Sequence, residues 1–345
     1  MQKPKFNYQK LTKNLLNNIP ERPKTIIDRR YGISTGKGET LQEIGDSLNI
    51  TRERVRQIEE WGFGLLEKSP SSKNIEPISR ALEEYLNFFG GLKKEDVLFY
   101  NLAPESQHSS LGLVLRLSPG LERFQETSQL HPFWSIGKKP QAAAKRVIDF
   151  LIKRFKKQNS PLEEKELDKI YQKEIMSVSG GKISKDAFRS YIEISKEIRK
   201  GAFDKIGLSF WSEINPRGVK DEAYLVFKKE EKPIHFSDLT DLINEYFRSK
   251  DEVAQIQTVH NELIKDPRFV LIGRGIYTLK EWGYEPGVVK DVIVKVLKTN
   301  KKPMTREQIV DGVLKCRMVK KNTVLFNLQD KNYFRKTEDG RYQTT

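Results

Sequence analysis

The chain has 345 residues, 37% of them hydrophobic, which allows two or three domains with small cores and disfavours one large core. Lys and Arg number 62 against 47 Asp and Glu, and this formal charge of +15 favours a polyanionic partner such as nucleic acid. The single cysteine, Cys316, excludes an internal disulfide, and the chain has neither a signal peptide nor an apolar run long enough for a membrane helix, so we expect a cytoplasmic protein without membrane contact.

Apolar residues recur at helical spacing over residues 41–61, and this pattern predicts two short helices that cross at a tight turn. Gly45 permits the close approach of the two helices. The expected core between them consists of Ile44, Leu48, Ile50, Val55 and Ile58.

The ends of both helices carry residues that cap free backbone groups. Thr40 and Glu43 have the spacing of a capping box at the start of the first helix. Asn49 tolerates left-handed backbone angles and suits the turn, and Thr51 is expected to cap the second helix. Together these residues predict a helix-turn-helix.

The second helix exposes polar side chains that suit the edges of base pairs. Arg52 and Arg56 form one i,i+4 pair, and Glu53 and Gln57 form the adjacent one. Arg can grip guanine, Glu can accept from the cytosine amino group, and Gln can pair with adenine. The alternative is an amphipathic hairpin with a solvated charged face. The residues expected to contact DNA are Thr40, Thr51, Arg52, Glu53, Arg54, Arg56 and Gln57.

The segment TLQEIGDSLNITRERVRQIE resembles region 4 of bacterial housekeeping-type sigma factors, and LLNNIPERPKTIIDRRYGI before it resembles the preceding helix pair. The resemblance covers about one fifth of the chain, within a head of residues 1–68. It implies a bacterial, nucleoid-associated protein whose helix-turn-helix reads a promoter −35 element and whose flank docks on the RNA polymerase flap. No aromatic-rich segment of the kind that melts the −10 element precedes the head, so we expect this chain not to open promoters alone.

A repeat follows the head. Gly91, Pro161, Pro233 and Pro303 each end a periodic helix, at intervals of 70, 72 and 70 residues, and a second helix follows each of them. A third helix and a pair of extended segments complete each unit, with turns at Gly201, Gly275 and Gly340. Three helices and a two-stranded wing predict four tandem winged helices, at residues 75–136, 142–216, 217–284 and 285–345. The expected fold is therefore mainly α with small β-wings.

The third unit carries a second resemblance. KPIHFSDLTDLINE and DPRFVLIGRGIYTLKEWG are similar to the HARE helix-turn-helix domain, which also occurs in the delta subunit of bacterial RNA polymerase. The resemblance covers residues 219–284 and implies a winged helix in transcription or DNA transactions rather than a catalytic site.

Basic residues in the later units are candidates for phosphate contacts, namely Lys185, Arg189, Arg274, Lys320 and Lys321. The alternative is that these are solvated faces of docking or spacer modules. The first unit has the apolar sequence SSLGLVLRLSPG where a reading helix would be charged, so we expect a protein contact there. Residues 69–74 and 137–141 have the composition of hinges, and units two to four are expected to form one rigid arm.

Several patterns that suggest catalysis or ligand binding fail on spacing. Residues 32–40, GISTGKGET, have three residues where a phosphate loop needs four. The four histidines, His108, His131, His235 and His260, lack Cys or acidic partners at metal-ligand spacing, although His235 and His260 are expected to pack or cap within unit three. We therefore expect no metal, no cofactor and no enzymatic activity.

Two functions remain. The favoured one is a sigma-like transcription initiation factor that binds promoter-like double-stranded DNA and contacts the RNA polymerase core. The alternative is a polymerase-associated accessory or scaffold protein without specific DNA reading.

Overall fold

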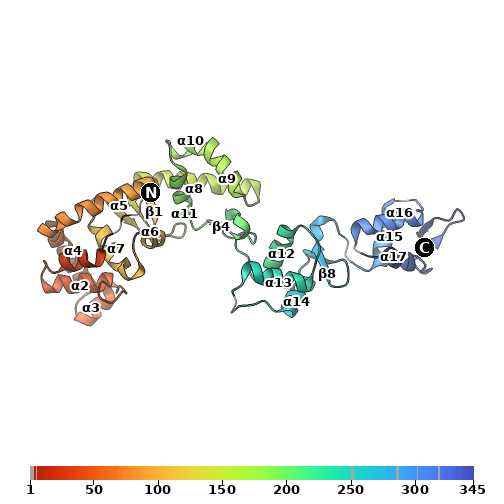
Figure 1. Cartoon of the computed structure of the whole chain (residues 1–345), viewed down its shortest axis with the longest axis horizontal. Coiled ribbons are helices and arrows are strands. Elements are labelled where there is room, and N and C mark those ends of the chain that lie inside the picture. The colour runs from red at the N-terminus through yellow and green to blue at the C-terminus, as the bar shows by residue number, and fades with distance from the viewer. Residues whose placement is uncertain (1–3, 5, 250–251, 285–286, 301, 318) are drawn as a thin grey trace. The chain divides into compact units, whose positions relative to one another are not determined.

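The structure is a computed structural model and describes every residue except 1–3, 5, 250–251, 285–286, 301 and 318. The chain divides into two compact units, Met1–Phe210 (unit 1) and Trp211–Thr345 (unit 2). It is mainly helical with small antiparallel sheets, as predicted and consistent with winged helices (Figure 1).

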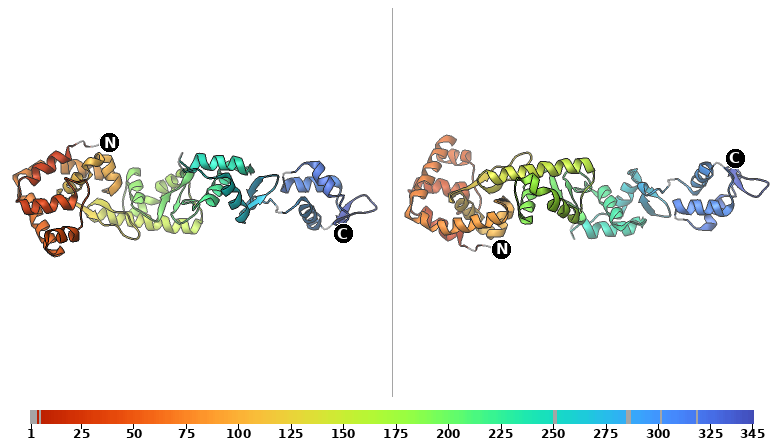
Figure 2. Two further views of the ribbon diagram at one scale, coloured as in Figure 1. Left: turned by 90° about the horizontal axis from the view of Figure 1, so that it is seen from below. Right: turned by 90° about the horizontal axis from the view of Figure 1, so that it is seen from above.

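Unit 1 opens with four helices, which lie together at one end of the unit (Figure 2). They are α1 (Tyr8–Leu16), α2 (Glu21–Tyr31), α3 (Leu41–Leu48) and α4 (Arg52–Lys68). The side chain of Asn7 caps α1 by accepting from the backbone N–H of Lys10. Gly32 ends α2 with a left-handed φ of 66°, a conformation that glycine adopts without strain. Local interactions with the backbone therefore fix where α1 begins and where α2 ends.

The next part of unit 1 contains three helices and a three-stranded sheet. Its elements are α5 (Glu76–Phe88), β1 (Leu92–Lys94), α6 (Glu95–Leu102), α7 (His108–Leu117), β2 (Leu121–Phe124) and β3 (Phe133–Ile136). The sheet is antiparallel in the order β1-β3-β2, with Leu92 opposite Ser135.

The last part of unit 1 repeats this order with a smaller sheet. Its elements are α8 (Lys139–Gln158), α9 (Glu164–Ile170), α10 (Met176–Ser179), α11 (Lys185–Glu193), β4 (Ile198–Lys200) and β5 (Ile206–Leu208). A π-helical turn, Tyr171–Ile175, joins α9 to α10. A single bridge between Leu162 and Ile206 stands where the other sheet has its first strand.

Unit 2 contains two further copies of the same order. The first has α12 (Val219–Glu230), β6 (Ile234–His235), α13 (Phe236–Phe247), α14 (Ile256–Lys265), β7 (Phe269–Leu271) and β8 (Ile276–Leu279). The second has α15 (Val289–Asn300), α16 (Arg306–Cys316), α17 (Lys321–Asn327), β9 (Phe334–Lys336) and β10 (Tyr342–Thr344), with a bridge from Met304 to Tyr342. In all four copies the segment between the first two helices pairs with the last strand.

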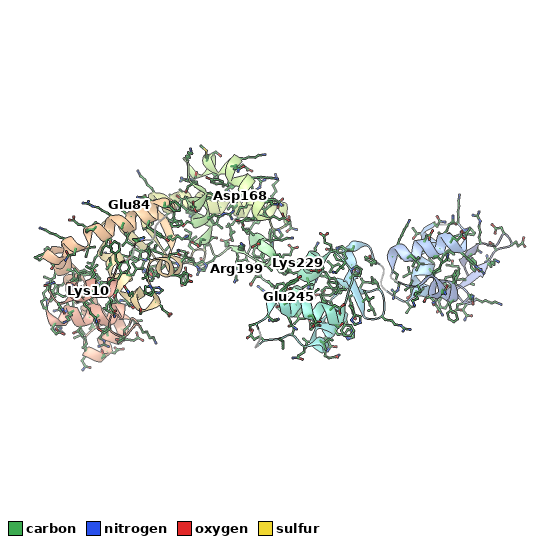
Figure 3. The ribbon with its side chains drawn as sticks, viewed as in Figure 1. Lys10, Glu84, Asp168, Arg199, Lys229 and Glu245 are labelled. Carbon is green, nitrogen blue, oxygen red and sulfur yellow. The ribbon has the colours of Figure 1, made fainter. Side chains whose placement is uncertain are left out.

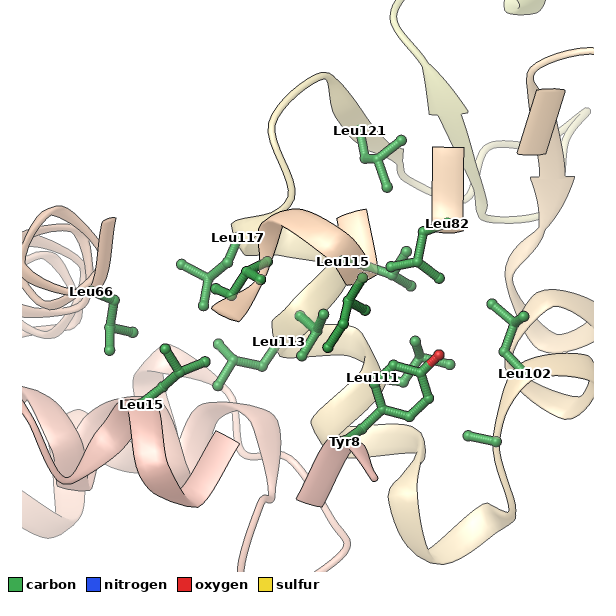
Figure 4. Close-up of a cluster of buried hydrophobic side chains, with 14 of the residues drawn as sticks. Tyr8, Leu15, Leu66, Leu82, Leu102, Leu111, Leu113, Leu115, Leu117 and Leu121 are labelled. Atoms are coloured by element: carbon green, nitrogen blue, oxygen red, sulfur yellow. The ribbon is translucent and has the colours of Figure 1, made fainter. Parts of the chain in front are cut away.

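The first copy and the N-terminal helices share one hydrophobic core. Leu15 and Leu66 belong to the same buried cluster as Leu82, Leu113 and Trp134. Figure 4 shows leucines of α7 lying among those of α1, α4 and α5. The apolar helix that the sequence marked as a protein contact is therefore buried against the N-terminal helices of its own chain.

The hinge predicted at residues 69–74 is wrong, because this segment is ordered and packed. It forms a 3-10 helix, Pro70–Asn74, between the buried residues Ser69 and Ile75. Residues 137–141 are no hinge either, since α8 begins at Lys139. Gly91 packs so closely on Pro140 that a Cβ at Gly91 would lie 2.6 Å from the Cγ of Pro140.

The second copy packs on the first rather than joining a rigid arm with the later ones. Ser190 and Tyr191 of α11 donate hydrogen bonds to the carbonyl oxygens of Leu92 (2.7 Å) and Gly90 (2.8 Å). The two copies in unit 2 have separate hydrophobic clusters. The expected arm of units two to four is therefore divided, with unit two in the N-terminal body.

Two of the three predicted turn glycines have left-handed backbone angles. Gly275 and Gly340 have φ values of 70° and 79°. Gly201 also lies in the predicted turn, between β4 and β5, but its φ is −98° and the left-handed positions there are Phe203 and Asp204, with φ values of 56° and 58°. The reversal between β4 and β5 thus uses a short 3-10 turn.

Candidate nucleic-acid interface

Helices α3 and α4 form a helix-turn-helix whose caps are those predicted. The hydroxyl of Thr40 accepts from the backbone N–H of Glu43 (3.2 Å), and the carboxylate of Glu43 accepts from the N–H of Thr40 (2.6 Å). Asn49 ends α3 with a φ of 52°, and Thr51 caps α4 by accepting from the N–H of Arg54 (3.1 Å). These local bonds fix where each helix begins and ends.

A small core holds the two helices at a short distance. Ile26 of α2 joins Ile44, Val55 and Ile58 in one buried cluster. A Cβ at Gly45 would lie 2.7 Å from the carbonyl oxygen of Ile50, so this position requires glycine. Leu48 was predicted in this core but is 38% exposed, because the last turn of α3 faces outward. α4 therefore sits rigidly on α2 and α3.

The five side chains of α4 predicted to contact DNA are all exposed: Arg52, Glu53, Arg54, Arg56 and Gln57. An α-helix turns by about 100° per residue, so Glu53 and Gln57 lie opposite the buried Val55 and Ile58. The arginines flank this outward stripe on both sides. Farther along α4, Trp61 is 53% exposed. The face is thus open to a partner along at least two turns.

The side chains on this face are linked to one another. Arg56 donates from Nε and Nη2 to the two carboxylate oxygens of Glu53 (2.9 and 2.6 Å), and its third nitrogen bonds Glu60. Arg54 donates to the amide oxygen of Gln57 (3.2 Å). Arg56 thus forms two ion pairs, one with Glu53 three positions before it and one with Glu60 four positions after it.

These links affect the charge on the exposed face of α4. The hydrogen bond from Arg56 lowers the pKa of Glu53, so this carboxylate stays ionised at neutral pH and acts only as an acceptor. Arg52 makes neither a hydrogen bond nor an ion pair with any residue that the structure describes. Arg52 is therefore an exposed cation without a bonded side-chain partner among the described residues, whereas Arg56 is bonded to two acids.

A second network, which the sequence did not reveal, fixes the loop before α3. Arg29 of α2 donates to Glu39 (2.9 Å) and to the hydroxyl of Ser47 in α3 (2.7 Å), and Arg30 donates to the backbone carbonyl of Glu39 (2.7 Å). The hydrogen bond from Arg29 lowers the pKa of Glu39. The loop that resembles a phosphate-binding sequence is thus a braced connection between α2 and α3.

The inner side of α4 meets α7. Arg116 of α7 lies over the ring of Phe63, 5.2 Å from its centroid, and Glu59 lies 3.9 Å from Arg30. Burial raises the pKa of Glu59 despite these nearby cations, and burial raises the pKa of Tyr31 to about 12. A packed, partly charged layer therefore supports α4 on its inner side.

The basic residues predicted in later copies have different environments. Lys185 and Arg189 of α11 both pair with Asp168 of α9, at 2.7 and 2.8 Å (Figure 3 labels Asp168). Arg274 is exposed in the turn between β7 and β8, and Lys320 and Lys321 are exposed at the start of α17. The α11 pair therefore has internal partners, and the others are open.

Within the described residues, no group of three or more His, Cys, Asp or Glu side chains could hold a metal ion. The predicted roles of two histidines are confirmed, since His235 caps α13 by accepting from the N–H of Ser237, and His260 stacks on Phe236 with centroids 4.5 Å apart. Among the helices that the structure describes, none is long and apolar enough to cross a membrane.

Comparison with known proteins agrees with this geometry. Residues 15–66 match the family model for sigma-70, region 4. RNA polymerase sigma factor SigA of Microcystis aeruginosa is 45% identical over 73 residues, which are 21% of this chain and 16% of that protein. SigA of Clostridium acetobutylicum is 36% identical over 61 residues, 18% of this chain and 16% of that protein. The sigma factor sigB of Arabidopsis thaliana is 38% identical over 71 residues, 21% of this chain and 12% of that protein.

The chain thus spans about one sixth of the length of the curated relatives it matches. The matched stretch contains α2, α3 and most of α4, with the capped starts of α3 and α4 and the core that the three helices share. Residues 15–66 therefore match sigma-70 region 4 in sequence, and α2, α3 and α4 are named the region 4 helices.

Proposed function

We propose that this chain is a sigma-like DNA-binding protein of transcription initiation, in which α4 enters the major groove of a −35-type promoter element. The observation that carries the proposal is that a region 4 helix-turn-helix presents an open polar face with arginines on both flanks. Arg52 and Arg54 would contact phosphates, Glu53 would accept from a cytosine amino group, and Gln57 would pair with adenine. Arg56 would release Glu60 and bind the edge of a guanine instead.

Thr40 and Thr51 would support DNA recognition from their positions at the starts of α3 and α4. Their hydroxyls are occupied as caps, so their contribution to DNA binding would be to keep the first backbone N–H groups of α3 and α4 aligned toward phosphates. Lys320, Lys321 and Arg274 would add phosphate contacts from unit 2. Lys185 and Arg189 would do so only on releasing Asp168.

The second proposed partner is the RNA polymerase core, because the relatives of residues 15–66 are RNA polymerase sigma factors. The apolar side of the region 4 helices is covered by α7 in this chain. A polymerase contact of the kind sigma factors make would therefore use the exposed rim of these helices or another part of the chain. No catalytic step belongs to the proposal.

We further infer that the four repeated segments are winged helices and that residues 217–284 are of the HARE type. Their common order, in which the segment between the first two helices pairs with the last strand, supports this inference. The proposed location is the bacterial cytoplasm, in association with the nucleoid.

Replacement of Arg56 by Ala tests the proposal directly. The preferred duplex would first be selected from a random library with the full chain, and its affinity then measured between 50 and 200 mM salt. Arg56→Ala should lose about 1 to 3 kcal/mol on this duplex and relax selectivity at one base pair. Arg80→Ala is the matched control, since Arg80 is an exposed arginine on α5, outside the region 4 helices. If Arg56→Ala binds every duplex as the parent does, the assignment of this face is wrong.

A scaffold without specific reading is the second candidate, and one surface favours it. Ile256 and Ile264 are exposed two turns apart on α14, and Leu271 of β7 is exposed as well. Exposed apolar side chains in such a group are typical of protein contacts rather than of DNA contacts. Capture of purified polymerase core by the chain in the absence of DNA, together with equal affinity for all duplexes, would support the scaffold.

A further inference from the structure

The positive charge of the chain is unevenly distributed among its segments. Residues 287–345 contain 14 Lys and Arg against 6 Asp and Glu, a formal charge of +8, which is more than half of the total of +15. Residues 137–216 carry 18 against 11, or +7. Residues 75–136 and 217–286 are acidic, with 5 against 8 and 11 against 13. Relative to its length, the segment of residues 287–345 therefore attracts nucleic acid most strongly.

The third helices of the four copies differ in what covers them. α7 is buried against the N-terminal helices, and α11 packs on the first copy through Ser190 and Tyr191. α14 is open but lies in an acidic segment and carries the exposed apolar residues Ile256 and Ile264. Of the third helices of the four copies, as far as the structure describes them, α17 is the one that is both exposed and part of a strongly basic segment.

The exposed face of α17 combines base-reading and apolar chemistry. Val324 and Leu328 face the core, whereas Asn322, Thr323 and Phe326 are exposed. Since a helix turns by about 100° per residue, Asn322 and Phe326 lie one turn apart on the side opposite Val324. Phe326 is 76% exposed, and nothing in the fold of this segment accounts for a large aromatic ring at that position.

Exposed cations lie at the start of α17 and on the wing that follows it. Lys320 and Lys321 are exposed where α17 begins, and Arg335 and Lys336 are exposed on β9 of the wing. The nearby Asp330 is paired with Lys290, and this hydrogen bond lowers the pKa of Asp330, so its charge is compensated. The segment that contains Phe326 thus offers exposed cations both before and after α17.

We infer that α17 is a second DNA-reading helix, which enters the major groove of duplex DNA and recognises an A·T pair. Asn322 donates to and accepts from the adenine edge, and Phe326 packs on the thymine methyl group. Lys320 and Lys321 bind the phosphates beside the groove, and Arg335 and Lys336 of the wing bind those on its other side. This goes beyond the proposed function, in which α4 alone reads bases.

The experiment uses the full chain, so that every segment stays in place. Random duplex libraries are selected with the parent, with the double variant Arg52→Ala/Arg56→Ala, and with that double variant carrying Phe326→Ala. The double variant should still enrich an A·T-containing sequence, and the addition of Phe326→Ala should abolish the enrichment and weaken binding to it by roughly fivefold or more. Failure of the α4 assignment would leave this difference intact, so the two proposals are tested separately.

Two further variants separate base reading from charge and from folding. Lys320→Ala/Lys321→Ala should leave the enriched sequence unchanged and reduce the slope of log affinity against log salt by about 2. Tyr100→Ala is the matched control, since Tyr100 is an 81% exposed aromatic residue in an acidic segment, and it should change neither affinity nor the enriched sequence. If Phe326→Ala instead weakens binding to polymerase core and leaves DNA binding as in the parent, α17 is a protein contact and the inference is overturned.

Discussion

Replacement of Leu113 by Ala in α7 should destabilise the region 4 helices, although Leu113 lies about 50 residues beyond their end. Leu113 is fully buried in the cluster that also contains Leu15 and Leu66. The change removes Cγ, Cδ1 and Cδ2, which at about 0.8 kcal/mol per buried carbon accounts for roughly 2.4 kcal/mol. The residual cavity adds to this, so we expect a loss of about 3 to 4 kcal/mol in the free energy of unfolding.

Urea denaturation followed by hydrogen exchange and mass spectrometry measures this loss in separate peptides. With a urea dependence of about 3 kcal/mol per molar, the midpoint should fall by about 1 M, and equally in peptides from α2–α4 and from α5–β3. Leu48→Ala is the matched control, because Leu48 is 38% exposed and should shift the midpoint little. A shift confined to the peptides of α5–β3 would refute the shared core, since region 4 would then unfold on its own.

Two further changes test the packing of the helix-turn-helix. Gly45→Ala should lower the melting temperature and weaken DNA binding, because the new Cβ would lie 2.7 Å from the carbonyl oxygen of Ile50. Gly64→Ala is the matched control and should be neutral or stabilising, since the space around its Cβ is open. Equal melting temperatures of the two variants would contradict the prediction. Glu59→Gln should raise the melting temperature at pH 7. Because burial raises the folded-state pKa of Glu59, the wild type loses stability as pH rises above the ordinary value of 4.5, so the advantage of the variant should vanish below that pH; a lower melting temperature at pH 7 would show that the carboxylate stabilises the fold.

The parts of the site that the sequence predicted correctly depend on short-range interactions. Thr40, Asn49 and Thr51 act on backbone groups within three residues of themselves, so their roles follow from residue type and spacing. The core positions Ile44 and Val55 follow from helical periodicity for the same reason. Leu48 satisfied the same periodicity yet faces outward, because it lies in the last turn of α3, where the chain leaves the helix.

The parts that the sequence did not predict depend on contacts between distant residues. Gln107 accepts from the backbone N–H of Tyr8 (2.9 Å), and Thr12 donates to Ser110 (3.0 Å), across about 100 positions. Periodicity reports that α7 is apolar but not which surface covers it. The prediction of a protein contact at this apolar sequence is therefore wrong, because the helix is buried in the core of its own chain.

The ion pairs of α4 are a further feature that the sequence alone could not decide. Residues three and four positions apart are equally near on a helix, so spacing alone permits Arg56 to pair with Glu53, with Glu60 or with both. Side-chain conformation decides between them, and here both pairs form. The sequence thus indicated which residues lie on the exposed face of α4 but not how they bond to one another.

The burial of α7 also determines how this chain could hold a promoter in space. With α1, α2 and α4 seated on α7, and α11 seated on β1, the angle between a duplex gripped at α4 and the long helix α8 would be set by close packing rather than by the length of a tether. Because Pro70–Asn74 is itself a 3-10 helix between the buried residues Ser69 and Ile75, adding or deleting a residue there would change the orientation of the bound DNA rather than loosen the connection.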